Sequence, residues 1–271
     1  MQLKPNLLAA LAALGLGSAP SWAILVRDDV DEARYWADAS QFGGLVDLSP
    51  EGHGVLIAPD WVLTAAHATL GSDLRRTGVT IGGKIRAVSA VVRHEKFAAP
   101  PADFASWTLS DNKSFLLAMD DIALIKLEAP VTDVEPIAIA SGAIEPGARF
   151  EFAGRGRFGT GSAGQITGSN PAQRLRFARN RIDEVNGHWF VYTFDCDARA
   201  LELEGFQGAG DSGTPLLIDH DGKRQVIGLI SWRWNGRRSS AGPAYGAQGY
   251  ALRLADYADW IVATTQSHAP D

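Results

Sequence analysis

The chain has 271 residues, of which 46% are hydrophobic and 21% are charged, as in a folded globular protein. Its formal net charge of −6 argues against nucleic acid as a partner, because phosphate binding requires a basic face. No apolar stretch reaches the roughly 20 residues that cross a bilayer, so we expect no membrane span.

Residues 1–23 have the pattern of a secretory signal. Lys4 precedes an apolar run over residues 7–17, and Ser21 and Ala23 place small side chains at the two positions that a signal peptidase inspects. We expect cleavage after Ala23 and a secreted or periplasmic protein. The alternative is that this segment forms a buried first helix.

After Ala23, short apolar runs rich in β-branched residues are separated by Gly, Pro, Asp and Asn. The runs lie at residues 44–48, 54–58, 61–63, 122–127 and 226–230. Their lengths favour the strands of an all-β protein. Prolines within residues 130–147 indicate an extended connection between two halves of the chain.

The chain also contains a proline-containing polar segment, one segment with helical spacing and a single cysteine. Residues 98–119 combine two prolines with Ser, Asp and Asn, which predicts a long surface loop whose role the composition does not define. Residues 254–262 carry apolar side chains at 3- and 4-residue spacing and form the one segment with a clear helical pattern. Cys196 is the only cysteine, so no intramolecular disulfide forms, and we expect a free structural thiol rather than a nucleophile.

Three short motifs carry a candidate chemistry. Thr-Ala-Ala-His ends at His67, Asp-Ile-Ala-Leu begins at Asp121, and Gly-Asp-Ser-Gly contains Ser212. A serine hydroxyl is a poor nucleophile at neutral pH, so it needs a base to take its proton and a carboxylate to hold that base. Alone, Ser212 is typical of a turn and His67 of a core histidine. Together, in this order, they predict a Ser-His-Asp triad, with the neighbouring Asp120 exposed to solvent.

Other motifs fail on their context. Residues 154–159 match the dinucleotide glycine pattern but lack the strand–helix setting and the acidic residue that follows it. Thr214 breaks the lipase pattern around Ser212, and Ala98 stands where a zinc-protease helix beginning at His94 needs its second histidine. We therefore expect no metal and no cofactor.

The motifs resemble those of a chymotrypsin-like (trypsin-fold) serine protease of the bacterial, disulfide-free type. The matching stretches are residues 56–67, 121–127, 208–213, 228–232 and 257–261. The resemblance implies two antiparallel β-barrels with the active site in the cleft between them, and a C-terminal helix. Residues 24–138 would form the first barrel, with His67 and Asp121. Residues 139–271 would form the second, with Ser212.

The resemblance also implies roles for residues near the nucleophile. The backbone N–H groups of Gly210 and Ser212 would bind the oxyanion, and the enzyme would act on a polypeptide substrate as a monomer. The specificity pocket would be built from the residues at the family's pocket positions, which here are Phe206, Ser231, Trp232 and Arg233.

The pocket departs from the trypsin type at two of these positions. Phe206 stands where trypsin-type enzymes carry an aspartate, and Arg233 stands where a glycine is usual. Both changes argue against a preference for Lys or Arg. A shallow or apolar pocket and an arginine-lined pocket that favours acidic residues both remain open.

Two alternatives follow from the same residues. The chain is an exported serine endopeptidase, or it is a non-catalytic protease homologue that binds peptides or proteins, a view supported by Phe206 and Arg233. In many animal relatives a newly freed N-terminus pairs with the aspartate before the nucleophile. Cleavage after Ala23 would expose Ile24, which either pairs with Asp211 in this way or only packs on the barrel.

Overall fold

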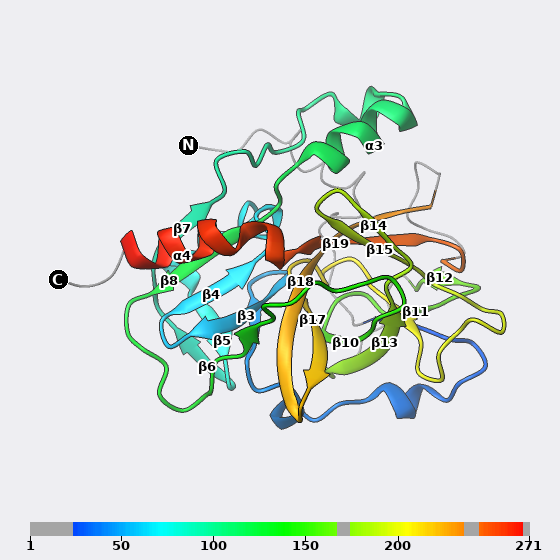
Figure 1. The fold of residues 1–271 in the computed structure, drawn as a ribbon, viewed down its shortest axis with the longest axis horizontal. Coiled ribbons are helices and arrows are strands. Elements are labelled where there is room, and N and C mark those ends of the chain that lie inside the picture. The colour runs from blue at the N-terminus through cyan, green and yellow to red at the C-terminus, as the bar shows by residue number, and fades with distance from the viewer. Residues whose placement is uncertain (1–23, 167–173, 236–243, 268–271) are drawn as a thin grey trace.

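The computed structural model describes residues 24–166, 174–235 and 244–267, so the expected signal at residues 1–23 lies outside the described residues. The chain is mostly β-structure, arranged as two curled antiparallel sheets that lie side by side with short helices around them (Figure 1). A short helix ends the described chain. These features confirm the predicted all-β architecture of two barrel-like halves and a C-terminal helix.

The first half is a sheet of seven strands in the order β6-β5-β2-β3-β4-β8-β7. Its strands are β2 (Leu45–Leu48), β3 (His53–Ala58), β4 (Trp61–Thr64), β5 (Val79–Ile81), β6 (Lys84–Arg86), β7 (Val88–Arg93) and β8 (Ala123–Leu127). A tight turn at Pro59 and Asp60 joins β3 to β4, and every residue of β4 is buried. This burial on both faces explains the nearly continuous apolar sequence of β4.

The second half is a larger sheet in the order β13-β10-β17-β18-β19-β15-β14, with β9 added beside β18. Its strands are β9 (Ala138–Ile139), β10 (Arg149–Gly154), β13 (Arg176–Arg181), β14 (Glu184–Asn186), β15 (Trp189–Thr193), β17 (Pro215–His220), β18 (Lys223–Trp234) and β19 (Gln248–Arg253). Asp221 and Gly222 both have positive φ angles, 53° and 72°, which is the backbone twist that a two-residue hairpin between β17 and β18 requires.

A small third sheet, in the order β12-β11-β1-β16, places the start of the described chain against the second half. Its strands are β1 (Leu25–Val26), β11 (Gly159–Thr160), β12 (Gly164–Gln165) and β16 (Gly205–Phe206). The buried Tyr35, in the 3₁₀ helix η1 (Glu32–Tyr35), donates its hydroxyl to the carbonyl of Glu204 at 2.9 Å. The first residues after Ala23 therefore contact the second half, whereas the sequence assigned them to the first.

The segment 98–119 is not the surface loop that its composition predicts. It holds the 3₁₀ helix η4 (Phe104–Ser106) and the α-helix α3 (Leu109–Ala118), and it buries Phe104 and Leu116. Thr108 caps α3 by accepting a hydrogen bond from the Asp111 N–H at 3.1 Å. The expectation was wrong because the buried side chains of Phe104 and Leu116 hold in place a helix whose exposed polar residues resemble those of a loop.

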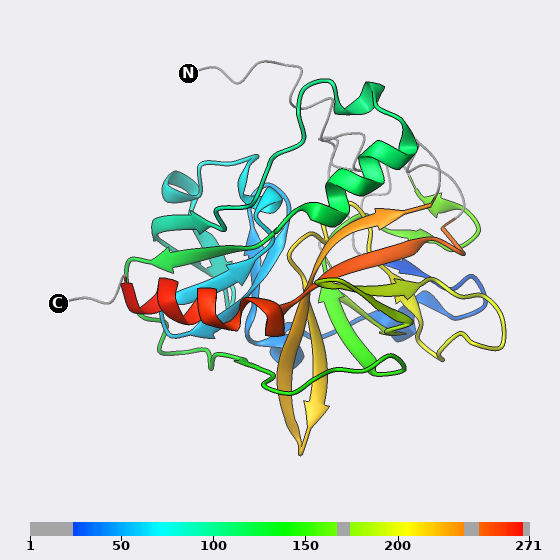
Figure 2. The same ribbon diagram turned by 45° about the horizontal axis from the view of Figure 1, so that its top comes forward.

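The remaining helices are short, and the last of them packs on the first half. They are α2 (Leu74–Thr77), α4 (Ala258–Ser267), and the 3₁₀ helices η2 (Ala39–Phe42), η3 (His67–Thr69) and η5 (Leu254–Tyr257). Figures 1 and 2 show α4 extending from the second half back over the strands of the first. In the described segments, no helix has the length and hydropathy needed to cross a membrane.

Two residues differ from expectation in their burial. Asp120 was expected to be solvated, but it is 8% exposed and accepts a hydrogen bond from the hydroxyl of Tyr257 at 2.5 Å. The ring of His94 lies on its other side, with Nδ1 3.4 Å from Asp120 Oδ2. Cys196 was expected to be a free structural thiol; it is free, but its exposed position gives it no part in the core.

We predict that Tyr257→Phe lowers the free energy of unfolding by about 1–3 kcal/mol, because the buried carboxylate of Asp120 loses a donor. Val262→Ala, on the following helix α4 and 51% exposed, is the control and should change stability by less than about 0.5 kcal/mol. Urea denaturation measures both. Equal stability of Tyr257→Phe and the unaltered chain would show that the Tyr257–Asp120 contact does not hold α4 in place.

Candidate active site

The topology of the first sheet brings His67 and Asp121 together. Strands β4 and β8 are antiparallel neighbours, and Thr64 at the end of β4 pairs with Ala123 at the start of β8. His67 follows β4 by three residues and Asp121 precedes β8 by two, so both lie at the same edge of the sheet. Ser212 comes from the second half, in the loop between β16 and β17.

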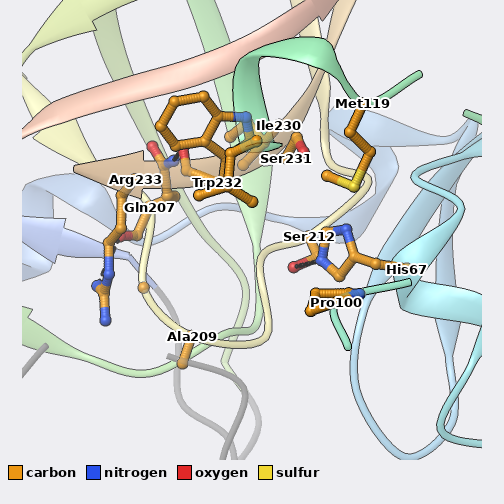
Figure 3. A pocket seen from close by; sticks show the side chains of 12 residues that line it. His67, Pro100, Met119, Gln207, Ala209, Ser212, Ile230, Ser231, Trp232 and Arg233 are labelled. Carbon is orange, nitrogen blue, oxygen red and sulfur yellow. Dashed lines mark hydrogen bonds between the residues drawn. The ribbon is translucent and has the colours of Figure 1, made fainter. Parts of the chain in front are cut away.

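The three side chains form one continuous hydrogen-bonded chain. His67 Nδ1 lies 2.6 Å from Asp121 Oδ2, and His67 Nε2 lies 2.7 Å from Ser212 Oγ. The backbone N–H of His67 also donates to Asp121 Oδ1 at 2.8 Å, which fixes the carboxylate relative to the ring. Figure 3 shows the His67 ring and Ser212 side by side at one end of a pocket. The structure thus brings together the three residues that the sequence placed in one triad.

The carboxylate of Asp121 is fully buried but remains the more stable form. Burial raises its pKa, but the charge of His67 and the hydrogen bonds from His67 and Ser231 outweigh burial, so that the pKa lies below its ordinary value of 3.8. Ser231 donates its hydroxyl to Asp121 Oδ2. Sequence reasoning placed Ser231 in the specificity pocket, and the structure shows that it also holds the acidic residue in place.

The loop that precedes Ser212 presents two backbone N–H groups near the nucleophile. Gly210 has a φ of 91°, a backbone conformation that residues other than glycine rarely adopt. Among the hydrogen bonds of the described residues, none uses the N–H of Gly210 or Ser212. These two donors are the ones expected to bind an oxyanion.

The side chain of Asp211 points away from the pocket and holds this loop in place by accepting backbone hydrogen bonds. Its Oδ1 accepts the N–H of Gly156 at 2.7 Å, and its Oδ2 accepts the N–H of Gly208 at 2.8 Å and that of Ile24 at 3.4 Å. A Cβ on Gly156 would lie 2.5 Å from the Asp211 carboxylate, so only glycine fits there. This contact gives residues 154–159 a structural role that the sequence pattern did not reveal.

A pocket that is open to solvent lies beside these three residues. The residues that line it are His67, Pro100, Leu116, Met119, Gln207, Gly208, Ala209, Ser212, Ile230, Ser231, Trp232 and Arg233. Pro100, Leu116 and Met119 belong to the segment that the sequence left without a role. The apolar side chains of these three residues, within a stretch that also holds Ser, Asp and Asn, were the feature of the sequence that could have indicated a place in the pocket.

The pocket contains three of the four residues expected in it. Trp232 forms one wall and stacks on Tyr250, with ring centroids 3.6 Å apart. Ser231 and Arg233 flank it. Phe206 does not line the pocket, because it is fully buried and stacks on Phe194 in the core of the second half. The family register predicted its position along the chain but not the direction of its side chain.

A family model described as Trypsin matches residues 37–261. A trypsin from Phaedon cochleariae is 27% identical over 233 residues, which cover 79% of this chain and 78% of that protein. Snake venom serine proteinase 14 from Crotalus adamanteus is 30% identical over 219 residues, or 77% and 75% of the two chains. Complement C1s subcomponent from Sus scrofa is 27% identical over 246 residues, which cover 82% of this chain but only 33% of that protein.

We predict that acid weakens the fold partly through Asp121. The folded-state pKa of Asp121 is lowered, so its stabilising effect is complete above its unfolded pKa of about 4 and is lost as the pH falls through the folded value. Urea denaturation between pH 7 and pH 2 should therefore show a steeper loss of stability for the unaltered chain than for Asp121→Asn. The same slope in both chains would contradict a depressed pKa at Asp121.

Proposed function

This chain belongs to the trypsin family of serine endopeptidases, and we propose that it is an exported endopeptidase that uses Ser212, His67 and Asp121 as its catalytic triad. The observation that carries the proposal is the continuous chain of short hydrogen bonds from Asp121 through His67 to Ser212. The substrate is a polypeptide.

The geometry supports a mechanism with an acyl-enzyme. Ser212 Oγ attacks the peptide carbonyl while His67 Nε2 accepts its proton, and the N–H groups of Gly210 and Ser212 bind the oxyanion that forms. His67 then gives the proton to the leaving amine. Water repeats the sequence to release the acyl group. Asp121 holds the His67 ring in the tautomer with Nδ1 protonated and stabilises its charged form.

The alternative, a non-catalytic homologue that binds peptides, has less support. Such proteins usually lack a triad member, and here all three side chains are in hydrogen-bonding contact. The Phe206 side chain, which favoured this alternative in the sequence, lies outside the pocket lining. Arg233 lines the end of the pocket opposite Ser212, and Ser212 itself also lines the pocket.

We also propose that signal cleavage after Ala23 activates the enzyme. The Ile24 nitrogen already lies 3.4 Å from Asp211 Oδ2, and Ile24 is fully buried. Leu25 and Val26 pair with β11 on one side and β16 on the other, so the segment is held without the glycines that animal relatives carry. Cleavage would turn the Ile24 amide into an ammonium that pairs with the buried carboxylate, and such pairs are strongly favoured over a single buried charge.

We predict that Ser212→Ala and His67→Ala each lower kcat/KM on a peptide by about 10⁴-fold or more, with little loss of stability. Because the two residues act as a unit, the double variant should be no worse than either single variant. Ser106→Ala changes an exposed serine on η4 and is the control, with activity expected to stay at its original level. A double variant far below both single variants would contradict a shared mechanism.

A fluorophosphonate probe read by mass spectrometry separates the two proposed functions. A protease should carry the adduct on Ser212, and His67→Ala should abolish it. A folded chain without an adduct on Ser212 would leave the binding-module view as the better account.

A further inference from the structure

Arg233 lies on the wall of the pocket that faces Ser212. It is in the last part of β18, where it pairs with Gly249 of β19. Figure 3 shows Arg233 and Gln207 at the end of the pocket opposite Ser212 and His67. A substrate side chain that enters from the attacked carbonyl would therefore run along the pocket toward Arg233.

The hydrogen-bonding capacity of the Arg233 guanidinium is only partly used by the described residues. Its Nη1 donates to the carbonyl of Gln207 at 3.4 Å, while its Nη2 is buried and has no hydrogen-bond partner. In the described part of the chain, no carboxylate forms an ion pair with it. Burial lowers the pKa of Arg233 to about 10, with Asp211 opposing the effect and Arg157 adding to it, so that the group stays charged at neutral pH. A buried, charged donor without a partner favours any ligand that supplies an acceptor.

The other side-chain donors of this wall, the Gln207 amide and the indole N–H of Trp232, are uncharged. The Gln207 amide is held within the protein, since its Oε1 accepts the Tyr192 hydroxyl and its Nε2 donates to the carbonyl of Trp232 at 2.9 Å. Of the lining residues in the described segments, Arg233 alone carries a permanent charge. Asp211 points the other way, toward Ile24, Gly156 and Gly208. The pocket is therefore electropositive at the end away from the nucleophile.

We propose that Arg233 is the specificity-determining residue and that the enzyme cleaves after Asp or Glu. This inference rests on the proposed function, because it takes the pocket to receive the residue whose carbonyl Ser212 attacks. The substrate carboxylate pairs with the guanidinium, whose planar fork can bind both of its oxygens. Trp232, the residue before Arg233, forms an apolar wall of the same pocket.

The test compares two peptides that differ only in Glu or Gln before the scissile bond. These residues have the same shape, so the ratio of their kcat/KM values reports the charge alone. We expect the unaltered enzyme to prefer Glu by about 10- to 100-fold, the range of a hydrogen bond to a charged group. Arg233→Gln should bring the ratio close to one, and Arg233→Lys should keep only part of it. Arg179→Gln, an exposed arginine of the same half that does not line the pocket, is the matched control and should keep the full ratio.

A second measurement needs no variant and therefore does not depend on how well the variants fold. On the unaltered enzyme the Glu-to-Gln ratio should fall several-fold as the pH is lowered from 7 to about 3.5, because the Glu carboxylate, with an ordinary pKa of about 4.3, gains a proton while Gln does not. The ratio cancels the pH dependence of the triad itself. A ratio that is constant over this range would overturn the proposal.

Two other outcomes would also overturn it. If Arg233 only occludes the pocket, the enzyme should cleave best after Gly or Ala, and Arg233→Ala should open the pocket to Leu and Phe. If Arg233→Gln keeps the preference for Glu, another group binds the carboxylate. Labelling of Ser212 by the fluorophosphonate probe distinguishes a failure of this inference from a failure of the proposed function. Normal labelling without a preference for Glu defeats this inference alone, whereas absent labelling defeats the proposed function.

Discussion

The buried carboxylate of Asp211 is the contact on which the geometry of the site depends. Its two oxygens accept N–H groups from Ile24, Gly156 and Gly208, three segments that are far apart in the sequence. A buried carboxylate is stable only when it is well satisfied, so these donors and the loop that carries Asp211 form one unit. The next residue is Ser212, and the preceding one is Gly210. The positions of the proposed nucleophile and of both proposed oxyanion donors therefore follow from how Asp211 is held.

The triad spans the two halves, so the halves must keep a fixed relation. The Ser231 hydroxyl of the second half binds Asp121 of the first, and the His53 N–H of the first donates to the Ser212 carbonyl at 2.7 Å. Tyr257, next to α4, reaches back to Asp120 beside Asp121. These contacts surround the catalytic residues on both sides, and each satisfies a buried polar group. Rigidity at the site is thus coupled to the packing of the C-terminal helix.

The sequence predicted the fold class and which three side chains would meet, because both depend on local patterns. His67, Asp121 and Ser212 lie in distinctive short motifs, and the mostly apolar sequence of β4 is typical of a buried strand. Features that depend on distant partners were missed. Asp120 looks like a surface acid until Tyr257, 137 positions later, is seen to cover it. Phe206 was placed correctly along the chain but turns into the core, because strand pairing with β1 decides which way it faces. The helix α3 was missed because its polar sequence has little amphipathic pattern, and packing of Phe104 and Leu116 holds the segment in place.

The central claim is that the Ile24–Asp211 contact shapes the active site, and the rate at which a fluorophosphonate labels Ser212 tests it most directly. Three chains are compared: one that begins at Ile24, one with a single extra residue before Ile24, and Asp211→Asn. The account predicts that the last two react about 100-fold or more slowly, the scale of losing an oxyanion donor, while all three remain folded. Equal labelling rates in all three chains would contradict it.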